Sequence, residues 1–315
     1  MVSQLAIKKR IASTISLQKI FRAQELISAS RISKSREYAF QAMPYADAIT
    51  KAVRAVVSHA NVNHVLINNK RKPKTTAILI IVSDRGMSGS YTSSIIKQAN
   101  AQIENLQKLG RKMKLYISGK RAVSYYKFRN IPIAKSWIGN SDAPTPERSQ
   151  EISSLLVEEF LKTSNNNGVD EVIIVCSEFV NMIIQRPRVI RMLPLEVVEQ
   201  SDNSKELGQS FAKVAKVEDD FSKNSLKNVP LYEFEPSAEA VLDAILPRYV
   251  QSRIQECLLE SAVSETASRQ RAMHTATDNA NDLVEDLTRK ANKVRQSAIT
   301  GELSEIVAGA SALQG

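Results

Sequence analysis

Apolar residues recur at helical intervals over the N-terminal part of the chain. Ile20, Ala23 and Ile27 show the three-then-four step of a helix that buries one face. The whole stretch contains no glycine that would favour a turn. Because Pro44 lacks the N–H group that a helix uses, we expect a kink or short break there. The pattern predicts an N-terminal shaft helix over residues 1–60, kinked near Pro44.

The period changes at Thr75, where a continuous run of branched residues begins and continues to Val82. Such a run is typical of a strand that is buried on both faces. Further strands are predicted at 112–118, 172–176 and 189–195, and helices at 93–109, 120–128 and 146–163. Strands that alternate with helices form a parallel sheet covered on both faces. We therefore predict a Rossmann-like, doubly wound α/β domain over residues 74–200.

Beyond this domain the chain becomes polar, and we interpret residues 201–235 as a polar connecting segment. A helix then begins after Pro236 and is ended or kinked by Pro247. From 248 to 313 only two glycines interrupt the helical pattern, and a helix tolerates single glycines. A helix of that length extends about 100 Å at roughly 1.5 Å per residue. Residues 236–315 are therefore predicted to form C-terminal shaft helices.

One face of the C-terminal helix is apolar, with members mostly three or four residues apart. This shaft seam consists of Ala280, Leu283, Leu287, Val294, Ala298, Leu303, Ile306 and Ala310. Its small and medium side chains allow close contact with another helix. Because the inserted domain has its two ends together, the long helices pair most simply antiparallel. The predicted fold class is α/β, a long antiparallel coiled coil of the N- and C-terminal helices with the doubly wound domain inserted.

The charge of the chain is unevenly distributed. Its 43 Lys and Arg residues exceed its 33 Asp and Glu residues, which gives a net charge of +10. The first 36 residues carry eight of the basic residues and a single acid, Glu25. This predicts an anionic partner. A nucleic-acid arm would fit, but Phe21 is the only aromatic residue available for stacking in the first thirty. A shaft inside an anionic protein cavity accounts for the same charge, and we expect no nucleic acid.

The turn from Asp84 to Gly89 follows the first buried strand, which is where a phosphate-binding loop would lie. It matches neither the GxGxxG nor the GxxxxGK[ST] pattern. We interpret it as a structural turn and expect no nucleotide cofactor.

Metal binding and catalysis are also not indicated. His59, His64 and His274 lack the spacing of metal ligands, and no Ser/His/Asp or Cys/His order suggests a nucleophile. Cys176 and Cys257 lie far apart in sequence without a CxxC motif, so neither a disulfide framework nor a zinc site is predicted. The longest run of strong hydrophobics is far shorter than the roughly 20 residues that cross a bilayer. We expect no direct membrane insertion.

A series of short motifs follows along the C-terminal helix. They include Ser264-Glu265, Arg269, Ala272-Met273, Ala276-Thr277-Asp278-Asn279-Ala280, Arg295-Gln296, Ile299-Thr300, Glu302-Leu303 and Gly309-Ala310. In their order and spacing these residues resemble the bacterial type of ATP synthase gamma subunit. Lys19-Ile20 and Ser83-Asp84-Arg85-Gly86 extend the resemblance over nearly the whole chain. Phe21 and Gln24 depart from the residues usual in that family.

The resemblance implies a non-catalytic rotor part of a proton-translocating ATP synthase, which couples proton flow through a membrane ring to ATP synthesis in the surrounding β subunits. The implied partners are the α and β subunits of the head, the ε subunit and the membrane c-ring. The implied location is the cytoplasmic face of the bacterial cell membrane, peripheral through the complex. The implied contacts with the β subunits are Arg295, Gln296 and Thr300, with Glu265 and Arg269 lower on the shaft. A cytoplasmic scaffold or signalling coiled coil with an inserted α/β domain is the alternative.

Overall fold

The computed structural model describes residues 4–59, 66, 73–162, 168–195 and 234–313. The chain divides into two compact units. The first unit consists of residues 1–29 and 269–315, and the second unit consists of residues 30–268. Most of the predicted connecting segment 201–235 lies outside the described residues.

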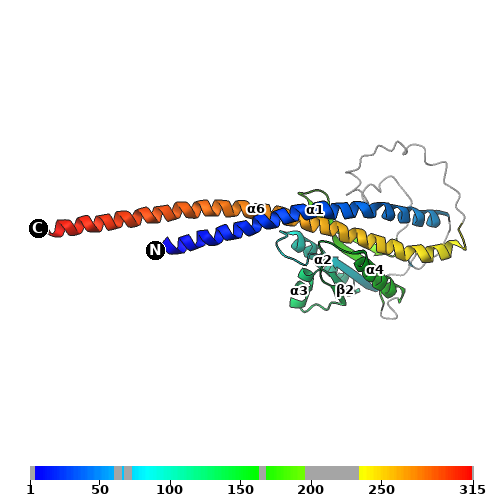
Figure 1. The fold of residues 1–315 in the computed structure, drawn as a ribbon. Coiled ribbons are helices and arrows are strands. Elements are labelled where there is room, and N and C mark those ends of the chain that lie inside the picture. Colours follow the sequence, from blue (N-terminus) through cyan, green and yellow to red (C-terminus); the bar gives the residue numbers. More distant parts are fainter. Residues whose placement is uncertain (1–3, 60–65, 67–72, 163–167, 196–233, 314–315) are drawn as a thin grey trace. The chain divides into compact units, whose positions relative to one another are not determined.

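Two long helices contribute to both units (Figure 1). Helix α1 is Gln4–His59 and helix α6 is Ala238–Leu313. Each contains a proline, Pro44 in α1 and Pro247 in α6, and each helix continues through it. Neither a break at Pro44 nor a helix end at Pro247 is seen. A proline removes only one hydrogen bond of its helix, and the many turns on both sides preserve the rest.

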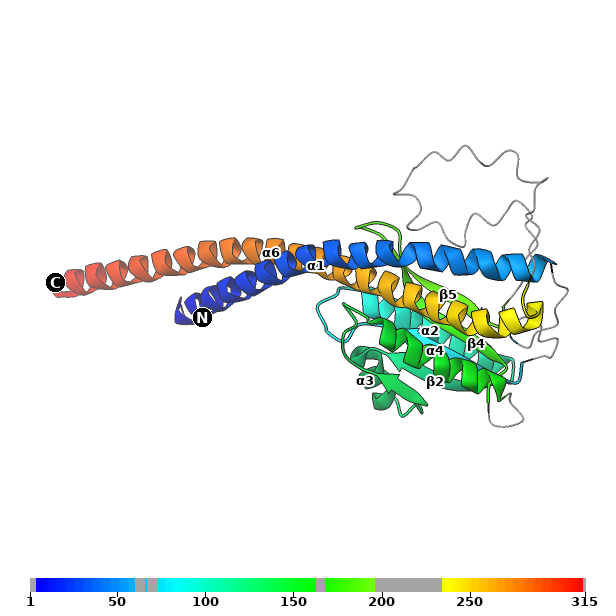
Figure 2. The same ribbon diagram turned by 45° about the vertical axis from the view of Figure 1, so that its right-hand side comes forward.

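The second unit contains a five-stranded sheet whose spatial order is β3-β2-β1-β4-β5. Figure 2 labels β2, β4 and β5 of this sheet. The strands are β1 Thr75–Ile81, β2 Lys112–Ser118, β3 Lys135–Trp137, β4 Glu171–Phe179 and β5 Gln185–Leu193. The helices are α2 Tyr91–Lys108, α3 Lys120–Phe128 and α4 Pro146–Leu161. The first four strands are parallel and β5 is antiparallel to β4. The inserted α/β domain is thus confirmed, with a mixed sheet.

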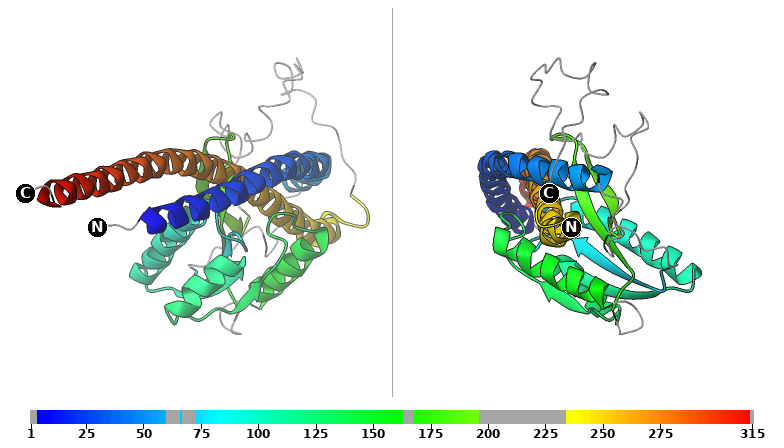
Figure 3. Two further views of the ribbon diagram at one scale, coloured as in Figure 1. Left: turned by 60° about the vertical axis from the view of Figure 1, so that its left-hand side comes forward. Right: turned by 90° about the vertical axis from the view of Figure 1, so that its right-hand side faces the viewer.

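The alternation of side chains along β1 divides the core of the second unit into two layers. Ala77 and Leu79 point to the layer that contains α4 and the α6 segment from 242 to 258. Ile78 and Ile80 point to the layer that contains α2 and α3. Figure 3 shows the helices on the two faces of the sheet. A strand with helices on both faces needs apolar side chains at every position, which explains the continuous run in the sequence.

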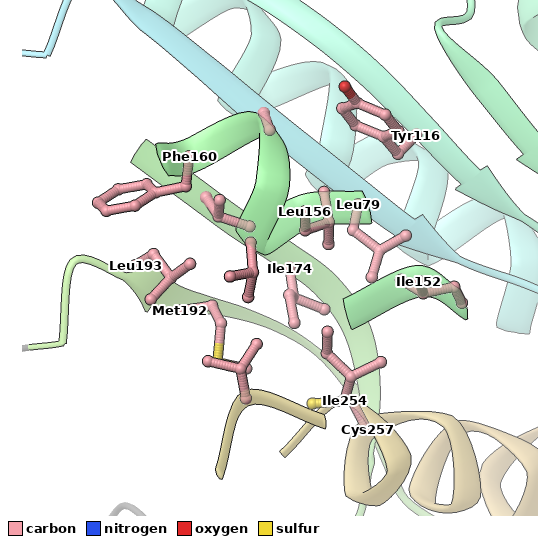
Figure 4. Packing of buried hydrophobic residues seen from close by; sticks show 14 of the residues in the cluster. Leu79, Tyr116, Ile152, Leu156, Phe160, Ile174, Met192, Leu193, Ile254 and Cys257 are labelled. Atoms are coloured by element: carbon pink, nitrogen blue, oxygen red, sulfur yellow. The ribbon is translucent and has the colours of Figure 1, made fainter. Parts of the chain in front are cut away.

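Helix α6 is therefore part of the α/β core as well as a long helix. In Figure 4, Ile254 and Cys257 of α6 lie among the buried side chains of the sheet and of α4, including Ile174 and Leu156. The sequence placed this part of α6 in the shaft alone. Its packing on the sheet is a feature that periodicity did not show.

Candidate partner-contact surface of the helical pair

Two polar contacts define how α1 and α6 pair within the first unit. Gln18 Nε2 donates a hydrogen bond to Asn281 Oδ1 at 2.5 Å, and His274 Nδ1 lies 3.0 Å from Glu25 Oε1. From the first contact to the second, α1 advances by seven residues while α6 retreats by seven. The helices are therefore antiparallel, as predicted, and the step equals the heptad of a coiled coil.

The Glu25 carboxylate is the centre of a small charged cluster in this helix pair. It is largely buried and also pairs with Arg22 Nη1 at 2.9 Å. The His274 ring is mostly exposed, and its Nε2 is 3.6 Å from Asp278 Oδ2. Local sequence could not show this cluster, because His274 is 249 residues away from Glu25. The cluster specifies the register of the two helices.

The predicted seam divides into two parts according to this register. Ala280 and Leu287 are buried, Val294 is half-buried and Leu283 is 39% exposed. Helix α1 begins at Gln4, which the same register places opposite Arg295. Later seam positions consequently have no α1 residue opposite them.

These later positions are exposed in the described chain. Ala298, Leu303 and Ile306 all point to solvent, and the side chain of Ala310 lies outside the described residues. Ile299 and Val307 are exposed as well, at 50% and 64%. Among the described residues, the apolar stripe therefore continues past the start of α1 and is exposed there. Contiguous exposed apolar side chains on a helix mark a surface that contacts another molecule.

The implied β-subunit contacts fall into two classes of exposure. Arg295, Gln296 and Thr300 are exposed, and the Thr300 hydroxyl donates to the Gln296 carbonyl oxygen at 2.9 Å. Glu265 and Arg269 are buried in the chain, at 1% and 7% exposed. Burial leaves those two side chains little surface for a partner. The difference was invisible to sequence analysis because all five residues occupy one uninterrupted helical pattern.

The turn after β1 uses its polar groups inside the α/β domain. The Asp84 carboxylate accepts hydrogen bonds from the backbone N–H groups of Lys120 at 2.8 Å and Ser141 at 3.0 Å. Met87 and Gly89 adopt positive φ angles of 60° and 57°. A carboxylate that joins two loops is a structural feature, which agrees with the interpretation of a structural turn.

Within the described residues, no group of three or more His, Cys, Asp or Glu side chains is placed to hold a metal ion. The described helices also include none that is long and apolar enough to cross a membrane.

Comparison with known proteins gives consistent matches. A family model described as ATP synthase matches residues 3–313. The ATP synthase gamma chain of Bifidobacterium adolescentis is 49% identical over 99% of this chain and 98% of its own length. The gamma chain of an Arthrobacter species is 46% identical over 97% and 96%. A chain in the central stalk and c-ring structure of the Tetrahymena thermophila mitochondrial ATP synthase matches with a TM-score of 0.56. That match has 20% identity, covers 82% of this chain and 99% of that chain, and shows the fold alone.

The fold defines a class of protein, an antiparallel pair of long helices with an inserted α/β domain and one exposed helix end. The chain belongs to the ATP synthase gamma-chain family. The gamma chain is the central stalk of the F-type ATP synthase, and catalysis takes place in the β subunits of that enzyme.

Proposed function

We propose that this chain turns within the catalytic head of a proton-translocating ATP synthase and couples proton flow to ATP synthesis in the β subunits. One observation carries the proposal beyond family membership. The apolar stripe of α6 continues past the start of α1 and is exposed there. A rotor needs such a surface to contact the head, whereas a scaffold built from a self-contained helix pair does not.

Contacts with the β subunits are assigned to Arg295, Gln296 and Thr300. All three are exposed on α6, near the point where α1 begins. A guanidinium and an amide can bind acidic and carbonyl groups of neighbouring loops. Because Glu265 and Arg269 are buried, the proposal assigns them no direct contact. The buried seam residues Ala280 and Leu287, with Val294, hold the helix pair together below this site.

Further partners and the location belong to the same proposal. The α subunits would surround the helix pair together with the β subunits, and the ε subunit and c-ring would bind elsewhere on the chain. The complex would lie at the cytoplasmic face of the bacterial cell membrane. The Tetrahymena relative was solved in a central stalk and c-ring assembly, which supports a ring partner.

Reconstitution with and without this chain tests the function. Complexes that contain α, β and the membrane ring should synthesise ATP from a proton gradient only when the chain is present. Equal synthesis in its absence would contradict the proposal. The chain would then be recovered without α and β subunits, as expected for a scaffold.

Variants of the proposed contact site should lower ATP synthesis without lowering the stability of the chain. Changing both Arg295 and Gln296 to alanine should lower coupled ATP synthesis about tenfold, while the free energy of unfolding changes by no more than about 0.5 kcal/mol, because both side chains are exposed. Synthesis in assembled complexes and urea unfolding of the chain measure the two effects. Lys290→Ala, also exposed and basic, is the matched control. Normal synthesis by the double variant would rule out the contact role.

A further inference from the structure

Helix α6 is buried at every position from Cys257 to Ala267, although this segment contains several polar side chains. A helix buried on all faces is normally apolar all round. Buried polar side chains need hydrogen-bond partners, and the carboxylate of Glu260 and the hydroxyl of Ser261 find theirs on strand β4. All of these residues belong to the second unit.

Strand β4 extends further than the parallel strand beside it. β1 pairs with β4 only as far as Val175, whereas β4 continues to Phe179. Backbone N–H groups two residues apart in a strand point to the same edge. The N–H of Ser177 donates to Ser261 Oγ at 3.4 Å, and that of Phe179 donates to Glu260 Oε1 at 3.2 Å. Side chains of α6 thus accept the hydrogen bonds that a neighbouring strand would otherwise accept.

Two more contacts connect the same turn of α6 to the α/β domain. The Tyr91 hydroxyl at the start of α2 donates to the Ser261 carbonyl oxygen at 3.1 Å. The thiols of Cys176 in β4 and Cys257 in α6 lie close enough to interact, and both belong to the same buried cluster. Both cysteines are free and buried. The sequence separated these cysteines by 81 positions, and only the packing of α6 on β4 brings them together.

The polar contacts fix the position of α6 along the sheet, which the apolar packing around them does not do. Apolar burial is non-directional and tolerates sliding of one surface along another. Buried N–H groups need acceptors at fixed positions, so movement of α6 along β4 would leave those of Ser177 and Phe179 unpaired. The contacts therefore fix the position of α6 on the sheet. We call the set of Tyr91, Ser177, Phe179, Glu260 and Ser261 the α6–β4 joint.

We propose that the α6–β4 joint passes rotation between the α/β domain and helix α6, with Glu260 and Ser261 as positioning residues. This inference rests on the proposed function, because only a rotor needs a connection that resists slip under load. It adds the particular contacts through which the load passes. The joint stays closed during turnover, so it acts as a rigid connection and not as a hinge.

The test uses the complete complex in membrane vesicles. The double variant Glu260→Leu with Ser261→Ala removes both acceptors and leaves the apolar packing in place. It should hydrolyse ATP within about twofold of the wild-type rate, while the protons pumped per ATP hydrolysed fall about threefold or more. Glu260→Gln keeps an acceptor oxygen and should pump normally. Glu239→Leu, at an exposed position of the same helix, is the control.

The pumping ratio separates a positioning role from a general loss of stability. An unstable chain lowers the amount of assembled complex and leaves the ratio of the assembled fraction unchanged. A normal ratio in the double variant would overturn the inference, and so would an equal loss in Glu239→Leu. If the double variant does not assemble, Ser261→Ala alone removes one acceptor and should give a smaller loss. A wild-type complex that fails to couple would instead overturn the proposed function.

The cysteine pair supplies a second measurement. Diamide oxidises two thiols to a disulfide, and its azo group takes up the two protons and two electrons and becomes a hydrazine. A disulfide between Cys176 and Cys257, identified by mass spectrometry, fixes α6 to β4. The oxidised wild-type complex should synthesise ATP within about twofold of the reduced complex. Loss of synthesis that dithiothreitol reverses would show that β4 and α6 must move, and would overturn the rigid joint. If no disulfide forms, the pumping ratio decides alone.

Discussion

Two stretches of helix α6 use apolar residues in opposite ways. Between Cys257 and Ala267 every residue is buried by the chain itself, whereas between Gly301 and Ala308 every residue is exposed. Both stretches carry apolar side chains at helical spacing. The buried stretch packs on a sheet of the same chain, and the exposed stretch has no residues of α1 opposite it. Helical spacing alone therefore does not distinguish an apolar face that the chain itself buries from one that it leaves exposed.

The largest expected difference between the two regions concerns isoleucines of equal size. Ile174 is fully buried in β4, and Ile306 is 66% exposed. Ile174→Ala should lower the free energy of unfolding of the isolated chain by about 3–4 kcal/mol, because it leaves a cavity in the core. Ile306→Ala should change it by less than about 0.5 kcal/mol. Urea unfolding measures both, and similar losses would mean that the tip of α6 is buried in the isolated chain.

Glu260 should give a stabilising change whose size depends on pH. Burial, assisted by repulsion from Glu256 and Glu178, raises the pKa of Glu260 to about 7, although the Phe179 N–H group and Arg188 favour the charged form. Between the ordinary carboxyl pKa and about 7, the folded chain holds a proton that the unfolded chain lacks, so stability falls as pH rises. Glu260→Gln should therefore stabilise the chain by about 3 kcal/mol at pH 8 and by little at pH 4.5.

Thermal or urea unfolding across this pH range checks the Glu260 prediction. Exposed Glu239→Gln is the control and should show no comparable dependence on pH. A Glu260→Gln variant that is stabilised equally at both ends of the range would show that the charge of Glu260 is not the cause.

A pair of leucines tests where intrachain helix pairing ends. Leu287 is buried in the seam and Leu303 is 58% exposed. Leu287→Ala should weaken the α1–α6 pairing by about 2 kcal/mol, measured by hydrogen exchange of amides in residues 1–29. Leu303→Ala should leave that exchange unchanged in the isolated chain. In the assembled complex, Leu303→Ala should also have an effect and should lower ATP synthesis.

The smallest effect is expected at the charged cluster of the helix pair. The His274 side chain is 60% exposed, and ion pairs of exposed groups contribute little. His274→Ala should change the free energy of unfolding by less than about 1 kcal/mol. Glu25 is more buried than His274. Glu25→Leu should therefore change the free energy of unfolding by more than His274→Ala does. Equal changes in the two variants would show that the cluster acts only through the contact they share.

Much of the α/β domain could be predicted because its elements carry local signals. Strand β2 and helix α3 have the predicted bounds, since a switch of period and flanking glycines mark both. Strand β3 was missed because its three residues, Lys135–Trp137, show no period at all. Strand β5 begins four residues earlier than predicted. Pro187 lies in this early part, and a proline within a run argues against a strand prediction. Pro44 and Pro247 lie within continuous helices, because the rest of each helix outweighs one missing hydrogen bond.

The sequence by itself determined the two long helices, the inserted domain, the antiparallel pairing and the family, because each rests on local periodicity or on motifs in order. Only the tertiary structure decided which seam positions face α1, that Glu265 and Arg269 are buried, and that Cys176 meets Cys257. These facts depend on the register between segments that are far apart along the chain. Periodicity repeats along a helix and is the same in every register, so it cannot specify which turn of one element lies against another.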